Sequence, residues 1–265
     1  MAQIVTHLKV LLADSYRFRE VFFNLLSQDL KIRYKRTVLG YFWSLLNPVL
    51  QLAVLSAVFS QIMRLGIKDY TLFLFSGTLA WTFLSNSLLS SSSALLENEN
   101  FIKKVYLPKL IFPLSKVCLR LVDFFFSLVA LGIIMAVLGF AFKITIVLIP
   151  LALAILFVFT LGLSVLLSVC TVYFRDINYL IGVFLQLLYF LTPIIYPLDT
   201  LQSKYRVVLQ FNPLYPPILL FQKLIYYGQV PLPIEWLSAS LLALTSAVIG
   251  FGVLSLLDED VVFRM

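Results

Sequence analysis

Long apolar stretches alternate along the chain with short polar segments. Six stretches approach the roughly 20 apolar residues that a helix needs to cross about 30 Å of hydrocarbon. They cover residues 38–63, 71–96, 114–142, 144–173, 179–195 and 236–257. Only Lys143 separates the third stretch from the fourth, so that join is the weakest of the boundaries. The pattern predicts an all-α integral membrane protein with six transmembrane helices.

A charged segment, residues 14–36, precedes the first span. Its polar residues recur at steps of three and four and so share one helical face: Arg17, Glu20, Asn24, Gln28, Lys31 and Lys35. Apolar residues cover much of the opposite face: Phe18, Val21, Phe22, Leu25 and Leu26. This predicts an amphipathic helix in the cytoplasmic interface, serving as a plain anchor or as a functional element. We therefore divide the chain into a cytoplasmic N-terminal segment, 1–36, and a six-span domain, 37–265.

A proline-rich region follows the fifth span. Pro193 and six further prolines between positions 197 and 233 flank the segment PILLFQKLIYY, which is apolar but too short to span a bilayer. Proline ends helices, and broken helices at membrane depth are tolerated only against protein or a watery cavity. We expect one or two re-entrant half-helices on the outer face, between spans five and six.

Composition supports a bilayer as the solvent. Of the 265 residues 61% are hydrophobic and 12% charged, and the mean hydropathy is +0.99, too apolar for the surface of a soluble protein. The net charge of +7 does not indicate nucleic-acid binding here, because the positions of Lys and Arg orient a membrane protein in the bilayer. Thirteen Lys and Arg residues fall on the side of the termini, counting Lys116 at the start of the third span, and six fall on the other side. Arg120, deeper in the third span, belongs to neither count. Both termini are therefore expected in the cytoplasm.

Several motifs for nucleotide binding, catalysis and metal binding are missing from the sequence. It has no G-x-x-x-x-G-K-[ST] loop, no G-x-S-x-G motif, and a single histidine, His7. Cys118 and Cys170 stand alone inside apolar stretches, so neither a metal site nor a disulfide framework is expected. Charges within the spans are too few for an ion relay. We expect no enzyme activity and no cofactor in this chain. If the chain transports a substrate, the energy must come from another polypeptide.

Arg120 and Asp123 are two charged residues inside the third span. They are three positions apart on one helical face and are expected to neutralise each other. The alternative is a direct role with substrate.

Five motifs are spread along nearly the whole chain. They are LKIRYKRTVLGYFWSLLNP (30–48), ENENFIKKVYLPKLIFPLSKV (97–117), YFRDINYL (173–180), LTPIIYP (191–197) and FNPLYPP (211–217). In these motifs the chain resembles the permeases of bacterial ABC-type exporters of O-antigen, capsule or wall teichoic acid.

The resemblance implies a multi-pass protein of the bacterial inner membrane that pairs with a second copy of itself. It also implies two copies of a separate ATPase subunit, which would bind ATP and Mg. The implied substrate is a lipid-diphosphate-linked, O-antigen-like polysaccharide. An ABC permease for another substrate, such as teichoic acid, capsule, a lipid or a drug, remains as one alternative. A membrane enzyme or a non-ATP carrier is the other.

The segment after the second span is the expected contact with the ATPase. Acidic and amide residues come before Phe101 and lysines after it, an order that the helix dipole favours. The expected coupling residues are Glu97, Asn98, Phe101, Lys103 and Lys104, with Phe101 as a knob for a groove on the ATPase. An ordinary solvated loop is the alternative.

Two further groups of residues suit the substrate. Four basic residues lie beside the bilayer and would bind a lipid diphosphate: Lys31, Arg33, Lys35 and Arg36. An equal alternative is that their positive charge only orients the chain in the membrane. Five aromatic residues would form a path for sugar rings: Tyr41, Trp43, Trp81, Tyr189 and Tyr196. In membrane proteins, Trp and Tyr more commonly form belts at the interfaces of the bilayer. The serine-rich run 85–93 would line the channel or permit close helix packing.

Overall fold

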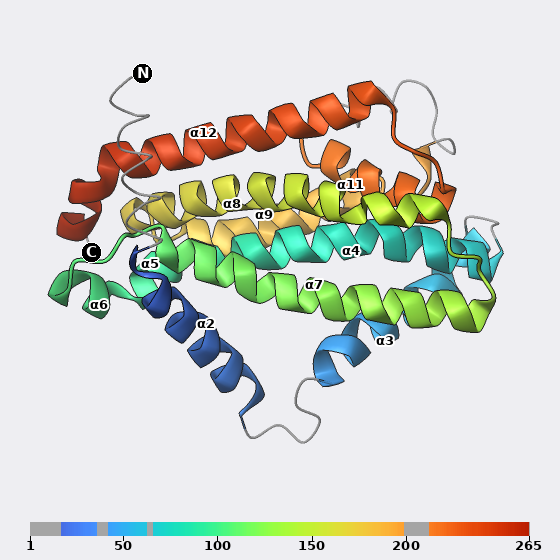
Figure 1. The fold of residues 1–265 in the computed structure, drawn as a ribbon, viewed down its shortest axis with the longest axis horizontal. Helices are drawn as coiled ribbons and strands as arrows, with labels where there is room; N and C mark the ends of the chain where they lie inside the picture. The colour runs from blue at the N-terminus through green and yellow to red at the C-terminus, as the bar shows by residue number, and fades with distance from the viewer. Residues whose placement is uncertain (1–16, 36–41, 63–65, 199–211, 265) are drawn as a thin grey trace.

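The computed structural model describes residues 17–35, 42–62, 66–198 and 212–264, and within these ranges the regular elements are all helical. Four long helices run side by side along the molecule (Figure 1): α4 (Ile67–Ser92), α7 (Ile111–Leu138), α8 (Ile149–Tyr173) and α12 (Pro233–Arg264). Each contains a stretch long and apolar enough to cross a membrane. The all-α membrane fold predicted from the sequence is confirmed.

The join between α7 and α8 has a clear local cause. Gly139, with a φ of 78°, ends α7 in the left-handed conformation that glycine adopts without steric cost. A 3₁₀ helix, η1 (Ile144–Leu148), then leads into α8, whose first turn contains Pro150. The boundary that Lys143 alone marked in the sequence is thus a glycine stop followed by a tight turn.

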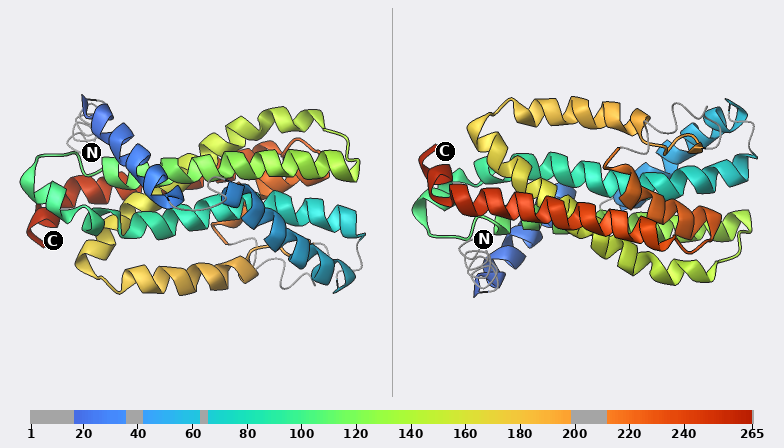
Figure 2. Two further views of the ribbon diagram at one scale, coloured as in Figure 1. Left: turned by 90° about the horizontal axis from the view of Figure 1, so that it is seen from below. Right: turned by 90° about the horizontal axis from the view of Figure 1, so that it is seen from above.

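Two shorter apolar helices lie beside the four long ones. In Figure 2 α9 (Ile177–Leu191) stands at one side of the bundle, where it packs against α4 and α8. The other, α3 (Phe42–Ile62), packs against α4 and α7 and contains the apolar stretch Val49–Ile62. A 15-residue helix such as α9 is only about 22 Å long, so the total of six spans stays a prediction.

The amphipathic helix is α2 (Arg19–Tyr34), and it packs on α7. The described members of its predicted polar face are exposed, whereas Val21, Phe22, Leu25 and Leu26 are half-buried. Leu25 packs against a small buried cluster of the bundle, so part of the apolar face rests on protein.

The proline-rich region contains one short helix within the described residues, α11 (Tyr215–Gln222), continued by the π-helix η3 (Lys223–Tyr227). Ile218, Leu220 and Phe221 are fully buried against the bundle. The element is too short to span a bilayer, as expected of a re-entrant half-helix, and residues 199–211 before it lie outside the described ranges.

Helices α8 and α12 cross closely at Gly162 and Gly250. A Cβ atom on Gly250 would collide with the carbonyl oxygen of Gly162, and one on Gly162 would collide with the backbone of Ser246. Two glycines that face each other let the backbones touch, a common device in membrane helix pairs.

Elements distant in the sequence gather at the two ends of the bundle (Figure 1). The α6 end holds α5 (Ala94–Glu97), α6 (Glu99–Lys104) and the C-terminal end of α12. The opposite end, the α11 end, holds η1, α11, η3 and the first turns of α4 and α12.

Candidate functional site

The predicted coupling segment folds as two short helices joined at Asn98. The Asn98 side chain donates a hydrogen bond to the Ala94 carbonyl oxygen at 2.8 Å. One turn apart on α6, the Lys103 ammonium lies 2.6 Å from the Glu99 carboxylate. The acid-first, lysine-last order does produce a helix, although it is interrupted at Asn98.

One side of α6 is buried and the other faces outwards. Ile102 is 7% exposed and belongs to a buried cluster with Leu95 and Phe112. Phe101 is 56% exposed, and Lys103 and Lys104 are exposed as well. Ile102 thus fixes α6 to the bundle while Phe101, Lys103 and Lys104 form an outward surface, which we call the α6 surface.

Phe101 also borders the N-terminal helix. It lines a hollow of about 160 Å³ together with Val21 and Leu25 of α2. Asn24 and Gln28 of α2 line the same hollow, so the space between Phe101 and α2 has both apolar and polar walls.

Lys116 connects three elements by ion pairs. Its Nζ lies 3.0 Å from Asp29 Oδ2 of α2 and 3.0 Å from Glu97 Oε2 of α5, and its side chain is 14% exposed. Partial burial alone would raise the pKa of Glu97, but the Ser93 hydroxyl and the Lys116 ammonium outweigh it and lower this pKa. Glu97, a predicted coupling residue, therefore stays ionised and bonded towards the bundle.

A second ion-pair cluster forms around Asp123. Arg120 Nη1 lies 3.3 Å from Asp123 Oδ2, so the two residues predicted to pair are in contact. The same oxygen also lies 2.6 Å from Nη1 of Arg33, a residue of α2 for which the sequence predicts either lipid-diphosphate binding or plain orientation. Arg120 Nε additionally donates to Ser90 Oγ of α4 at 3.3 Å. The clusters at Lys116 and Asp123 fasten α2 to α7 at two points.

The other basic residues of the predicted lipid-diphosphate group are placed differently. Lys31 and Lys35 are exposed on α2 or at its end. Arg36 lies outside the described residues, as does Tyr41 of the predicted glycan path.

The described residues of the predicted aromatic path have different environments: some contact other helices or loops of the bundle, and one is exposed. Trp81 of α4 is 6% exposed, and its ring centroid lies 5.5 Å from that of Tyr189 on α9. The Tyr196 hydroxyl donates to the Phe190 carbonyl oxygen at 2.9 Å. Trp43 of α3 is 47% exposed. In this structure Trp81 and Tyr189 join α4 to α9, whereas Trp43 faces outwards.

Some residues that shape the α6 end were not singled out from the sequence. Lys109 Nζ lies 2.7 Å from Asp258 Oδ1 and holds the end of α12, whose Arg264 stacks 4.7 Å above the Tyr173 ring. A usable signal exists for Lys116, because it falls inside the predicted third span and a charge there requires a partner. The sequence does not tell which partner it takes.

Aromatic and ammonium groups dominate the α6 surface. Such groups bind a protein partner by packing and by charge-assisted hydrogen bonds. In the part of the chain that the structure describes, no group of three or more His, Cys, Asp or Glu residues could hold a metal ion.

A comparison with protein families identifies the family to which this chain belongs. The family model described as "ABC-2 type transporter" matches residues 20–226, a range that runs from α2 to η3 and includes both ion-pair clusters and α6. The chain belongs to the ABC-2 type transporter family. The resemblance drawn from the five sequence motifs is thereby confirmed, and the protein is a membrane-embedded ABC-2 permease.

Curated relatives of this ABC-2 permease cover most of its length. It is 33% identical over 227 residues to the O-antigen export system permease protein RfbA of Myxococcus xanthus, covering 83% of this chain and 86% of the relative. It is 32% identical to RfbA of Klebsiella pneumoniae, over 76% of this chain and 78% of the relative. The polysialic acid transport protein KpsM of Escherichia coli is 23% identical, over 84% of this chain and 87% of the relative.

Proposed function

We propose that this permease is the membrane-spanning subunit of an ATP-driven exporter of a lipid-diphosphate-linked, O-antigen-like polysaccharide. The observation that carries the proposal is the 31–33% identity to permeases named for O-antigen export, over 76–83% of the chain. The lower identity, 22–23%, to proteins named for polysialic acid transport favours an O-antigen-like glycan over a capsular one.

The energy source would be a separate ATPase that binds ATP and Mg and docks on the α6 surface from the cytosol. The exposure of Phe101, Lys103 and Lys104 at one end of the bundle supports this assignment. The protein would lie in the bacterial inner membrane with both termini in the cytoplasm, as the distribution of Lys and Arg favours.

Two copies of the chain and two ATPase subunits would form the exporter, with the glycan path between the copies. The outward side of α9 supports this arrangement, because Val183, Phe184 and Leu187 are each 57–63% exposed there. Trp43 on α3 would belong to the same path.

The ion-pair clusters supply a route from the ATPase to the substrate. A displacement of α6 would move α5, which adjoins it. Glu97 of α5 and Asp29 of α2 both pair with Lys116, so α2 would move as well. Arg33 then ties α2 to Asp123 in the middle of α7. Since Lys31 and Lys35 lie on or beside the same α2, ATPase movement would reposition the residues that receive the lipid diphosphate.

Reconstitution tests the proposal directly. The permease and its ATPase are placed in vesicles with ATP outside and a lipid-linked O-antigen in the outer leaflet, and glycan protected from an added glycosidase is measured. We expect protection that needs ATP hydrolysis and is absent with an ATPase whose phosphate-loop lysine is replaced. Protection of a polysialylated lipid but not of the O-antigen lipid would contradict the substrate assignment. Protection of neither, with ATP turnover insensitive to both, would contradict the export function.

A further inference from the structure

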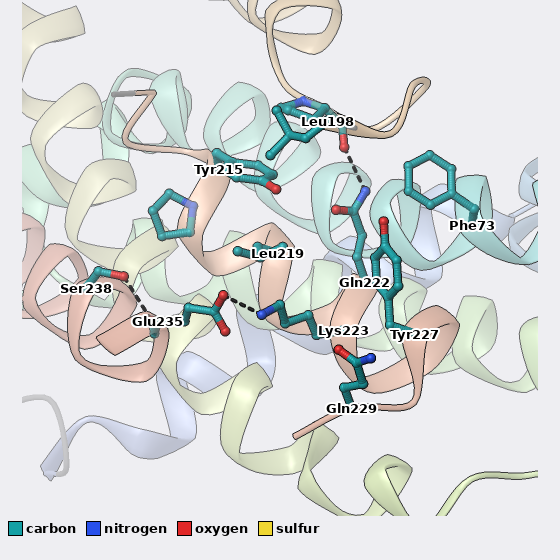
Figure 3. A pocket seen from close by; sticks show the side chains of 12 residues that line it. Phe73, Leu198, Tyr215, Leu219, Gln222, Lys223, Tyr227, Gln229, Glu235 and Ser238 are labelled. Atoms are coloured by element: carbon teal, nitrogen blue, oxygen red, sulfur yellow. Dashed lines mark hydrogen bonds and ion pairs between the residues drawn. The ribbon is translucent and has the colours of Figure 1, made fainter. Parts of the chain in front are cut away.

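The α11 end contains a cavity of about 400 Å³ that the coupling route does not use. It lies between α4, α11, η3 and the first turns of α12 (Figure 3). Its volume falls within the range of about 300–1,000 Å³ typical of small-molecule sites.

The wall of this cavity combines aromatic rings with hydrogen-bonding groups. Tyr215 and Tyr227 supply rings, and Gln222 and Gln229 supply amides, arranged around the open space in Figure 3. Tyr227 is 37% exposed and Gln229 is exposed, so both can be reached from outside. A sugar ring has apolar faces of C–H groups and an edge of hydroxyls, which matches such a wall.

The charge in the wall is balanced. Lys223 Nζ lies 2.5 Å from Glu235 Oε1, and Glu235 Oε2 accepts a hydrogen bond from the Leu232 N–H at 2.7 Å. The lining residues thus carry one positive and one negative charge, joined to each other. A neutral polyhydroxylated ligand suits this wall better than a phosphate or a cation.

Hydrogen bonds hold the wall in place before any ligand arrives. Gln222 Nε2 donates to the Pro193 carbonyl oxygen at 2.7 Å, and Lys143 Nζ donates to that of Tyr226 at 2.7 Å. Thr145 Oγ1 donates to the Leu224 carbonyl oxygen at 2.7 Å. Because α11 and η3 are fixed from several sides, binding would require little further ordering of the protein.

We propose that this cavity binds a single neutral sugar residue of the exported glycan at the α11 end. The nature of the ligand follows from the wall itself, whereas the glycan as its source rests on the proposed function. Gln229 and Tyr227 contact the sugar, and the Lys223–Glu235 pair offers its hydroxyls one donor and one acceptor.

Saturation-transfer NMR on the purified permease–ATPase complex in nanodiscs tests the binding. The probes are neutral methyl hexosides of the gluco, galacto and manno series, with glucuronate and glucosamine as charged comparisons. We expect transfer to at least one neutral hexoside, reduced roughly 3- to 10-fold by Gln229→Ala and by Tyr227→Ala. Gln61→Ala, which removes an exposed glutamine of α3 outside the cavity, should leave it unchanged. Absence of transfer, equal transfer in all variants, or a preference for a charged sugar would overturn the proposal.

A second arm identifies the source of the sugar. An oligosaccharide released from the strain's own surface glycan should displace the methyl hexoside at lower concentration than free hexoses do. Displacement only at equal or higher concentration would overturn the glycan as the source. Binding that the variants abolish, in a complex that exports no glycan, would refute the proposed function and leave the sugar site. Export without hexoside binding would refute the site alone.

Discussion

Neighbouring residues on α6 have opposite environments. Ile102 is buried in the bundle while Phe101 is exposed, so one residue anchors the helix and the next is available to a partner. The sequence predicts a cytoplasmic location for both residues but does not show which of them the bundle buries.

Removing the α6 surface should separate ATP hydrolysis from export. In the variant Phe101→Ala, Lys103→Glu, Lys104→Glu we expect ATP turnover to persist and glycan export to fall roughly 10-fold or more, because aromatic and basic anchors dominate protein interfaces. Both rates are measured in the reconstituted vesicles. Phe263→Ala, at an 88% exposed position near the end of α12, is the control and should export normally. Unchanged export in the triple variant would remove the coupling assignment.

Arg33 and Lys31 are both basic residues of α2, yet only Arg33 lies 2.6 Å from Asp123. Arg33→Ala should loosen α2 and speed its amide hydrogen exchange roughly 2- to 10-fold, a modest effect because the Arg33 side chain is 35% exposed. Lys31→Ala, the matched control, should leave exchange in α2 unchanged. Equal exchange in the two variants would mean that the Arg33–Asp123 pair does not hold α2.

At the scale of elements, α8 and α12 depend on the contact of Gly162 with Gly250. Gly250→Ala forces the two backbones apart and should lower the unfolding free energy by about 1–3 kcal/mol, seen as a lower melting temperature of the purified protein. Gly252 lies on the same helix with open space around it, so Gly252→Ala should be neutral or slightly stabilising. Equal melting temperatures for both variants would contradict the close crossing.

The α2 element shows how a local pattern and a tertiary contact combine. Its spacing of polar residues predicts the exposed face, because that face is set by 3.6 residues per turn. Its attachment to α7 depends on Arg33 and Asp123, which are 90 positions apart, and no local pattern relates them.

At the scale of the whole molecule, the α6 end and the α11 end should lie on opposite sides of the membrane. With Cys118 and Cys170 replaced by serine, Val230→Cys should react with an impermeant maleimide in intact spheroplasts. Lys104→Cys should react only after the membrane is disrupted, since the distribution of Lys and Arg predicts that it lies in the cytoplasm. Both positions are exposed, so burial does not limit labelling. Labelling of Lys104→Cys in intact spheroplasts would overturn the orientation and the docking of the ATPase.

The sequence by itself determined the membrane class, the long helices and the amphipathic helix, and it favoured a short helix over residues 97–104 without showing the break at Asn98. These follow from the length and period of apolar stretches and from the order of charges, which are local properties. Only the tertiary structure decided that Asp123 pairs with Arg33 as well as Arg120, that Lys116 bridges Asp29 and Glu97, and that a cavity opens beside Tyr227. The physical reason is that side chains on different helices meet according to how those helices pack, and the apolar pattern buries a face without naming its neighbour.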